Sequence, residues 1–230
     1  MDKIYEFQAG EVLLVNKPLD WTSFDVVNKI RYELKKKLGL KKIKVGHAGT
    51  LDPLATGLLV LCSGKKTKII NQFIQEDKSY DGIIQLGATT PSFDLETDVD
   101  KSFPTSHINE ELIEKVRVHF LNETTQIPPI FSAKKINGRR AYDYARNNEP
   151  IKLEPNLIKI NELKLELFEQ NQLKFEIRCS KGTYIRSLAR DIGEALKSGA
   201  HLSKLRRTKS GNFLLKDAKS IEDWIQIINT

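Results

Sequence analysis

Residues 162–196, ELKLELFEQNQLKFEIRCSKGTYIRSLARDIGEAL, encode two strands and a helix in immediate succession. Apolar residues alternate with polar ones on both sides of a turn near Gln170 and Asn171, which is typical of a hairpin of half-buried strands. The alternating positions are Leu163, Leu165 and Leu167, then Leu173, Phe175, Ile177 and Cys179. Helical spacing follows at Ile185, Leu188, Ala189, Ile192 and Leu196. A hairpin that leads directly into a helix favours an α+β fold over a doubly wound one.

The flanking sequence contains further strands and helices of the same mixed kind. Short apolar segments predict strands at residues 11–16, 58–62 and 79–86. One helix is expected to begin after a cap at Thr22 or Ser23 and to end at Gly39. Others are expected at residues 67–74, 109–120 and 141–146. A last one follows Ser220, with Asp223 in the capping-box position.

Length and composition indicate one folded domain. The chain has 230 residues, 40% of them hydrophobic, which suffices for a large domain with a modest insertion. Cys62 and Cys179 lie in apolar or alternating segments and are predicted to be buried thiols in a reducing compartment. The longest strongly apolar run, residues 58–62, is far shorter than a membrane span, and the first ten residues lack the apolar stretch of a signal peptide. We therefore expect a soluble, cytoplasmic protein with no membrane partner.

Positive charge is concentrated in two distant segments. The chain has 37 lysines and arginines against 30 acids, a net charge of +7. Residues 31–68 hold ten basic and two acidic side chains, and residues 178–209 hold nine and two. Such clusters suit a polyanion, because each phosphate contact releases counterions and adds affinity. Lysines at the end of the predicted helix before Gly39 also stabilise the helix dipole, so solvated lysine remains an alternative.

A glycine-rich segment, VGHAGTLDPLATG at residues 45–57, immediately precedes the predicted strand at residues 58–62. Its glycines permit close approach of another backbone, and Pro53 restricts Asp52 to an extended conformation. The Asp52 carboxylate is therefore presented at a fixed place. Two interpretations stay open from this pattern alone: Asp52 does chemistry, or it caps a turn before Pro53.

A second candidate lies where the strand ending at Cys179 passes through Gly182 into a helix. Arg186 falls in the first turn of that helix, where the dipole disfavours a cation unless an acid or a phosphate faces it. Asp52, an RNA phosphate and plain solvent are the three partners open to it.

The pattern offers no sign of a metal or a cofactor. His47, His107, His119 and His201 are scattered without paired ligand spacing, and the sequence contains no Cys-x-x-Cys. Neither a phosphate-binding P-loop nor a dinucleotide fingerprint is present. We expect no metal and no cofactor.

Residues 124–155 are rich in proline and glycine and look like an excursion from the core. They surround a short helical pattern at residues 141–146. Their basic and aromatic side chains suit either a surface that grips RNA or, for the tyrosines, anchorage of the excursion to the domain. These side chains are Lys134, Lys135, Arg139, Arg140, Tyr142, Tyr144 and Arg146.

Taken in order, these motifs resemble the TruB family of pseudouridine synthases, the bacterial enzymes that act on uridine 55 of tRNA. The matching motifs are VNKP (15–18), WTS (21–23), GHAGTLDPLATGL (46–58), KSY (78–80), LG (86–87), PIFSAK (129–134), CSKGTYIR (179–186) and LRR (205–207). The resemblance implies a pseudouridine synthase fold, with a mixed, largely antiparallel sheet, flanking helices and an insertion at about 126–156 that folds over the RNA. It implies an isomerase that converts the uridine at position 55, in the T loop, to pseudouridine.

The resemblance also assigns roles to single residues. Asp52 matches the catalytic nucleophile, Arg186 the arginine paired with it, and Tyr80 the tyrosine that stacks on the target base. His47 matches the histidine that fills the space left by the flipped nucleotide. Tyr184 and Leu205 match positions that contact the substrate pocket, whereas Lys17 and Pro18 match a motif expected to be structural.

One departure from the family concerns the C-terminus. Only 19 residues follow Gly211, where many members continue into an RNA-binding domain. We therefore expect a single catalytic domain at 1–230, with a short helical tail at 212–230 and no separate C-terminal RNA-binding domain. We further expect a monomer that binds the T stem-loop of tRNA without a guide RNA.

Two other functions remain open. A non-catalytic tRNA-binding or RNA-folding protein would use the same basic surface and would not need Asp52. An enzyme of the same chemistry could act on another RNA, because residues outside the reacting group select the RNA.

Overall fold

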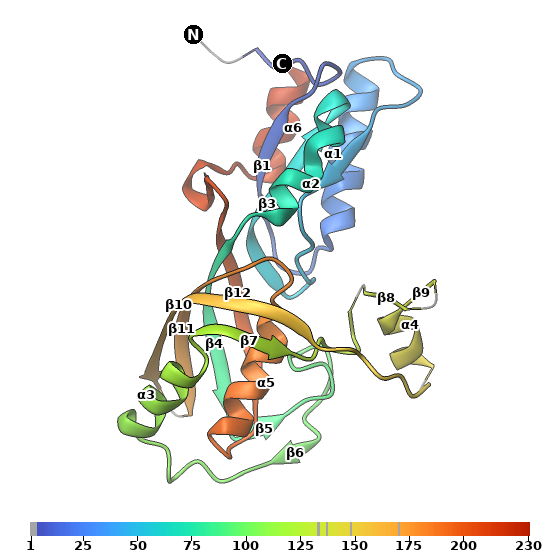
Figure 1. Ribbon diagram of the computed structural model, residues 1–230. Coiled ribbons are helices and arrows are strands. Elements are labelled where there is room, and N and C mark those ends of the chain that lie inside the picture. Colours follow the sequence, from blue (N-terminus) through green and yellow to red (C-terminus); the bar gives the residue numbers. More distant parts are fainter. Residues whose placement is uncertain (1–3, 133, 137, 148, 170) are drawn as a thin grey trace. The chain divides into compact units, whose positions relative to one another are not determined.

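The computed structural model describes residues 4–132, 134–136, 138–147, 149–169 and 171–230 (Figure 1). The chain forms two compact units, Met1–Tyr80 with Leu205–Thr230, and Asp81–Lys204. It passes between them within two strands, β4 (Lys78–Leu86) and β12 (Ala200–Ser210).

The first unit is built on a small mixed sheet. Its strands are β1 (Val12–Lys17), β2 (Val45–His47), β3 (Ala55–Ser63), β13 (Phe213–Leu214) and the second half of β12. Both β1 and β2 run antiparallel to β3. By contrast, β3 and β12 are parallel, with Ala55 opposite Leu205 and Gly57 opposite Arg207. The expected strands at residues 11–16 and 58–62 are confirmed, and β3 is longer than predicted.

Two capped helices cover the core of this unit. Thr22 caps α1 (Ser23–Lys37) and Ser220 caps α6 (Ile221–Asn229), in each case with a reciprocal aspartate, so both predicted starts are confirmed. The core that they enclose includes Leu13, Val15, Ile30, Leu34 and Trp224. The indole Nε1 of Trp224 donates a hydrogen bond to the Leu14 carbonyl at 2.9 Å and thereby ties α6 to β1.

The single helix expected at residues 67–74 is wrong in detail. The chain instead forms a 3-10 helix, η1 (Gly64–Ile69), and then a short α-helix, α2 (Ile70–Gln75). The Thr67 hydroxyl donates to the Gly64 carbonyl at 2.7 Å, and α2 has no side-chain cap of its own. Short 3-10 turns of this kind are frequent at the ends of α-helices. A second 3-10 helix, η2 (Leu215–Asp217), precedes α6.

The second unit contains the predicted hairpin. Within it the strand order is β12, β4, β11 (Gln172–Cys179), β10 (Asn156–Phe168) and β7 (Asn122–Gln126). Strands β10 and β11 pair antiparallel, with Leu165 opposite Phe175 and Leu167 opposite Leu173, as the alternation predicts. Gln170, placed in the turn by the sequence, lies outside the described residues. The α3 helix (Glu110–His119) and α5 helix (Ile185–Ala195) confirm the other two predictions for this unit, and a short ribbon joins β5 (Ala88–Thr89) to β6 (Lys101–Ser102).

The excursion leaves and rejoins the sheet at one point. Gln126 at the end of β7 pairs with Asn156 at the start of β10. Between them lie β8 (Lys135–Ile136), β9 (Arg139–Arg140) and the predicted helix α4 (Ala141–Arg146) (Figure 1). The Arg139 guanidinium lies 4.3 Å from the centre of the Tyr144 ring, so at least one tyrosine of the excursion is contacted from within it. The side chains of Lys135 and Arg140 lie outside what the structure describes.

Two absences concern only the described part of the chain. No helix there is long and apolar enough to cross a membrane. No group of three or more histidine, cysteine, aspartate or glutamate side chains is arranged there to hold a metal ion.

Cys62 and Cys179 are both buried and do not form a disulfide with each other, as the sequence predicts. Burial raises the pKa of the Cys62 thiol to about 11, so this group stays protonated at neutral pH. We expect the native protein to resist a thiol-specific reagent at pH 8, whereas the protein in denaturant reacts at both cysteines. Absorbance of the released chromophore measures this directly, and rapid modification of the native protein would contradict it.

Candidate active site

The segment between β2 and β3 forms a loop that carries Asp52. The loop is anchored by main-chain hydrogen bonds from Ala48 N–H to the Val60 carbonyl (2.8 Å) and from Ala55 N–H to the Asp52 carbonyl (3.1 Å). The second bond is a turn around Pro53, as the Asp-Pro pair suggests. Three side chains from other elements hold the rest of the loop.

Lys17 supports the loop from the end of β1. Its side chain is fully buried, and its Nζ donates to the carbonyls of Trp21 (2.6 Å), Pro18 (2.8 Å) and Pro53 (3.2 Å). Burial lowers the pKa of this ammonium to about 8, while the charge of Asp52 is the largest of the influences that raise it. Lys17 is therefore a cation at neutral pH, next to the residue that follows Asp52.

Ser23 supports the loop from the first turn of α1. Its Oγ accepts a hydrogen bond from Leu51 N–H at 2.8 Å and donates to the Leu51 carbonyl at 3.0 Å. Leu51 is itself buried in the core of the first unit. The sequence indicated Ser23 only as a possible helix cap and as part of the WTS motif. That cap is Thr22, which leaves the Ser23 hydroxyl to hold the residue before Asp52.

Arg207 supports the loop from β12, and sequence reasoning quoted it only as part of a motif. The side chain is fully buried. Its Nε donates to the Leu58 carbonyl at 2.7 Å, its Nη2 to the Gly49 carbonyl at 3.1 Å and its Nη1 to the Thr50 carbonyl at 3.5 Å. The guanidinium thus contacts the chain on both sides of Asp52.

His47 lies at the end of β2, at the entrance to this loop. Burial, and then the positive charge of Arg207, lower the pKa of the imidazole below its ordinary value of 6.5. Within the described part of the chain, its Nδ1 is a buried atom without a hydrogen-bond partner. His47 is therefore neutral at pH 7.

Tyr80 and Leu205 are half-buried against the core that also contains Leu51 and Ala55. Leu205 lies directly opposite Ala55 across the β12–β3 pair. Together with His47 and Asp52, four of the six predicted site residues therefore belong to the first unit.

Tyr184 and Arg186 belong to the second unit, at the start of α5. Both main-chain groups of Tyr184 bond to the side-chain amide of Gln126, at 2.8 Å and 3.1 Å. Arg186 is 4% exposed, which excludes the solvated arginine that the sequence left open. Its pairing with Asp52, which lies in the other unit, stays a prediction.

The structure gives Arg186 an acidic partner that sequence reasoning missed. Its Nε lies 3.5 Å from Oδ2 of Asp94, which is also buried. Its Nη1 donates to the Ser92 carbonyl at 3.1 Å and its Nη2 to the Phe131 carbonyl at 2.9 Å. Phe93, between Ser92 and Asp94, has a positive φ of 64°. The segment therefore turns tightly at Phe93, between the two residues that contact Arg186. No residue pattern marked Asp94, because its role depends on α5.

Comparisons with known proteins show which proteins the chain is similar to. Residues 35–185 match the model of the TruB family pseudouridylate synthase N-terminal domain, and residues 186–228 match that of the tRNA pseudouridylate synthase B C-terminal domain. The tRNA pseudouridine synthase B of Phocaeicola vulgatus is 55% identical over 218 residues, 95% of this chain and 93% of that protein. That of Flavobacterium johnsoniae is 52% identical over 217 residues, 94% and 95% of the two chains.

Solved structures show the same fold. A chain from the crystal structure of a Cbf5-Nop10-Gar1 complex superimposes with a TM-score of 0.71 at 29% identity. A chain from the structure of an H/ACA RNP bound to a substrate RNA containing 2'-deoxyuridine gives 0.67 at 28%. Each match covers 96% of this chain but only 54% and 53%, respectively, of the longer one.

The lowered pKa of His47 gives a pH dependence of known sign. The folded state binds this proton more weakly than the unfolded chain does. The contribution of His47 to the free energy of unfolding is therefore complete above about pH 6.5 and is lost as the pH falls through its folded-state pKa.

We expect NMR titration of the imidazole, assigned with His47→Gln, to give a midpoint below 6.5. Chemical denaturation should show that the wild type loses more stability than His47→Gln as the pH is lowered from 7 to 5. A midpoint at or above 6.5 would contradict the burial of the neutral ring.

Proposed function

The chain belongs to the TruB family of pseudouridylate synthases, and we propose that its substrate is the uridine at position 55 in the T loop of tRNA. Its activity is the isomerisation of uridine to pseudouridine in tRNA, the reaction for which its relatives are named. It acts as a monomer and without a guide RNA. The observation that carries the proposal is the Asp52 loop, whose main chain is held by Lys17, Ser23 and Arg207.

The target base must first leave the stacked loop of the RNA. A uridine inside a folded T loop does not expose its glycosidic bond to a side chain, so the nucleotide is turned out at a cost of a few kcal/mol. Contacts with the protein offset this cost. His47 occupies the space that the nucleotide leaves, and its neutral ring can stack there without adding a buried charge.

Asp52 then acts on the ribose as an ionised carboxylate. It attacks C1′ and breaks the bond from C1′ to N1 of the base, or it removes the C2′ proton as that same bond breaks. The freed uracil rotates against the ring of Tyr80, and C5 bonds to C1′ as the ester bond between Asp52 and C1′ breaks or, in the second route, as Asp52 returns the proton to C2′. The proton at C5 is then lost while N1 regains one. Bonds made equal bonds broken, so the isomerisation requires neither a cofactor nor a metal.

Arg186 keeps Asp52 ionised in the closed complex, because a nearby cation offsets the desolvation of a carboxylate. Its side chain is already oriented in its own unit by Asp94 and by two carbonyls. Tyr184 and Leu205 contact the substrate pocket. These roles follow from the match of each residue to the family motif.

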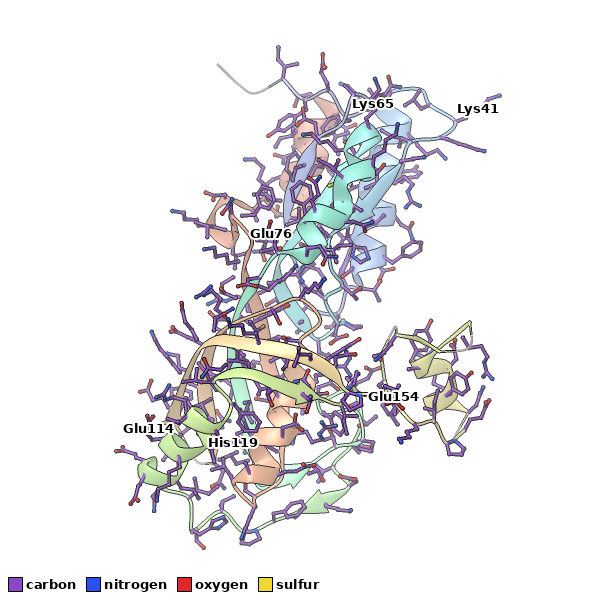
Figure 2. All side chains as sticks on the ribbon, in the orientation of Figure 1. Lys41, Lys65, Glu76, Glu114, His119 and Glu154 are labelled. Carbon is purple, nitrogen blue, oxygen red and sulfur yellow. The ribbon has the colours of Figure 1, made fainter. Side chains whose placement is uncertain are left out.

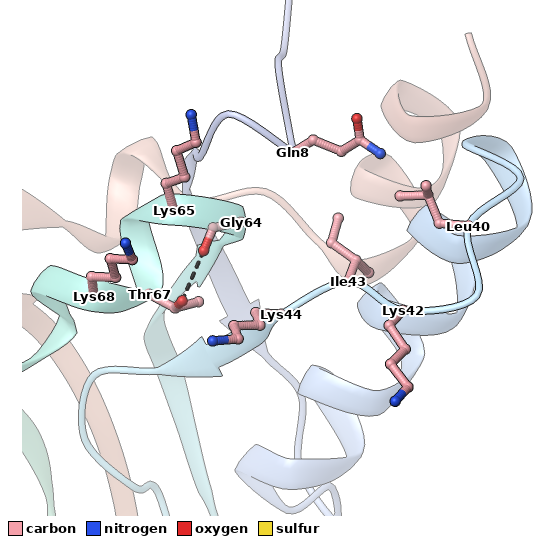
Figure 3. Close-up of a pocket in the computed structure, with 9 residues that line it drawn as sticks. All are labelled: Gln8, Leu40, Lys42, Ile43, Lys44, Gly64, Lys65, Thr67 and Lys68. Carbon is pink, nitrogen blue, oxygen red and sulfur yellow. Dashed lines mark hydrogen bonds between the residues drawn. The ribbon is translucent and has the colours of Figure 1, made fainter.

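A basic pocket in the first unit supports binding of the RNA backbone. It has a volume of about 270 Å³ and lies between η1 and the segment before β2 (Figure 3). Four of its nine lining residues are lysines and none is acidic: Lys42, Lys44, Lys65 and Lys68. Figure 2 shows Lys41 and Lys65 at this same end of the unit. All four of these lysines come from the positive segment of residues 31–68. The lining residues Leu40 and Ile43 add an apolar surface.

The catalytic role is tested by Asp52→Asn, which preserves shape and removes the charge. Incubation with unmodified tRNA transcripts and mapping of pseudouridine at nucleotide resolution should show product at position 55 with the wild type. The variant should form none while binding tRNA within a few-fold, because the phosphate contacts lie elsewhere.

Asp20→Asn is the matched control and should keep full activity. Asp20 is exposed, lies in the left-handed region that asparagine also tolerates, and donates its N–H to the Pro53 carbonyl of the same loop. Substantial turnover by Asp52→Asn would make Asp52 a turn cap. Binding without any product from the wild type would favour an RNA-folding protein, and product elsewhere a different RNA target.

The role of the basic pocket is tested by the salt dependence of tRNA binding. The double variant Lys44→Gln, Lys68→Gln should bind several-fold more weakly at low salt. Its slope of log affinity against log salt concentration should be less steep by about 1 to 2, because two phosphate contacts are lost. The rate at saturating tRNA should be unchanged.

The matched control removes two exposed lysines of the second unit, Lys101→Gln and Lys174→Gln. Filter binding at four salt concentrations measures both proteins. Equal slopes for the two double variants would refute a specific role of the pocket.

A further inference from the structure

We propose that Arg207 is a positioning residue of the reaction: its buried guanidinium sets the place of Asp52 relative to the strand that carries Leu205. The proposal rests on the proposed function, in which Asp52 is the catalytic carboxylate. Arg207 itself need not touch the RNA. It acts through the main chain of the loop.

One side chain holds both ends of the loop. Arg207 Nη2 and Nη1 bind the carbonyls of Gly49 and Thr50, and Thr50 is two residues before Asp52. Arg207 Nε binds the carbonyl of Leu58, on β3 after the loop. The planar guanidinium fixes the directions of these donors, so the two ends cannot shift separately without losing a bond. A lysine has no such fork.

The main chain of Arg207 is fixed at the same place. Arg207 pairs with Gly57 across the parallel β3–β12 ladder. A Cβ on Gly57 would lie 2.4 Å from the Arg207 carbonyl oxygen and 2.8 Å from its nitrogen, and Gly57 has φ +99°. The strands therefore approach here more closely than any side chain at position 57 permits. Both the backbone and the side chain of Arg207 are docked on the segment that carries Asp52.

The alternation of side chains along β12 relates Arg207 to Leu205, the residue of this strand that is expected to contact the substrate pocket. Leu205 and Arg207 are two residues apart on one strand, so their side chains share a face of the sheet. Their burial agrees, because the intervening Arg206 is exposed. The hydrogen bonds from Arg207 to Gly49 and Thr50 thus relate the carboxylate to a residue expected to contact the substrate pocket.

The charge of Arg207 affects the neighbours of the loop as well. It helps to lower the pKa of His47 and, to a smaller extent, that of Lys17. Its hydrogen-bond partners named above are all main-chain carbonyls, which satisfy the donors without neutralising the charge. Burial and, after it, this cation lower the pKa of His47 and keep its ring neutral, while the same guanidinium holds the loop.

The test compares Arg207→Lys with wild type in three measurements on the full chain. Single-turnover pseudouridine formation at saturating tRNA should fall by at least tenfold, while tRNA affinity changes by less than threefold. Hydrogen exchange of the Leu51 amide, which bonds to Ser23, should become at least tenfold faster. The control is Trp224→Phe, which loses a buried hydrogen bond of the same unit, far along the chain from the loop. Compared at the same thermal stability as Arg207→Lys, it should keep the wild-type rate of pseudouridine formation and the wild-type exchange rate of the Leu51 amide.

Wild-type turnover and Leu51 exchange in Arg207→Lys would overturn the proposal, and so would equal losses in Trp224→Phe. If Arg207→Lys does not fold at 25 °C, the same measurements on Arg207→Gln decide. In Arg207→Gln the titration midpoint of His47 should also rise, whereas Arg207→Lys, which keeps the charge, should leave it near that of the wild type. The exchange and titration measurements need no activity. Failure of the wild type to form pseudouridine would therefore refute the proposed function, and the positioning of the loop by Arg207 could still be tested by itself.

Discussion

Two buried cations, Lys17 and Arg207, donate their hydrogen bonds to main-chain carbonyls around a single loop. A buried charge costs several kcal/mol unless its donors are satisfied, and a carbonyl left without its donor is also costly. The loop conformation and the burial of these cations are therefore stable only together. This constraint explains why a segment with three glycines holds one shape. It places the Asp52 carboxylate on a rigid support before any RNA is bound.

The rest of the first unit serves this support. The capping box of Thr22 and Asp25 determines where α1 begins and so directs the Ser23 hydroxyl at Leu51. The parallel pairing of β3 with β12 brings Arg207 to the loop from a segment about 150 residues later in the chain. In the second unit, Asp94 and two carbonyls orient Arg186 in the same manner. Each unit thus carries a charged group whose geometry is fixed by its own packing, the preorganisation that electrostatic catalysis requires.

Much of the fold could be predicted because its signals are local. The β10–β11 hairpin follows from strict alternation, and the starts of α1 and α6 follow from a hydroxyl and an aspartate three residues apart. The helix expected at residues 67–74 was wrong at its start, where the chain forms a 3-10 helix before the α-helix, and the two kinds of helix differ little in energy. Such a small energy difference leaves no periodic pattern in the residues.

The sequence by itself determined the segregation of charge and many of the helices and strands, and it predicts Asp52 as the reacting carboxylate, since Asp52 lies in a motif of contiguous residues. Only the tertiary structure revealed what holds that carboxylate. Ser23, Arg207 and Asp94 act on main-chain or side-chain atoms of residues distant in sequence, and nothing in their local pattern distinguishes them from a cap, a surface cation or a turn aspartate. For Ser23 and Arg207 the physical reason is that hydrogen bonds to backbone carbonyls carry no residue identity on the acceptor side, and for Asp94 it is that its partner Arg186 lies about 90 residues away in the chain. No local pattern of residue types therefore predicts these contacts, and their partners are determined only when the chain folds.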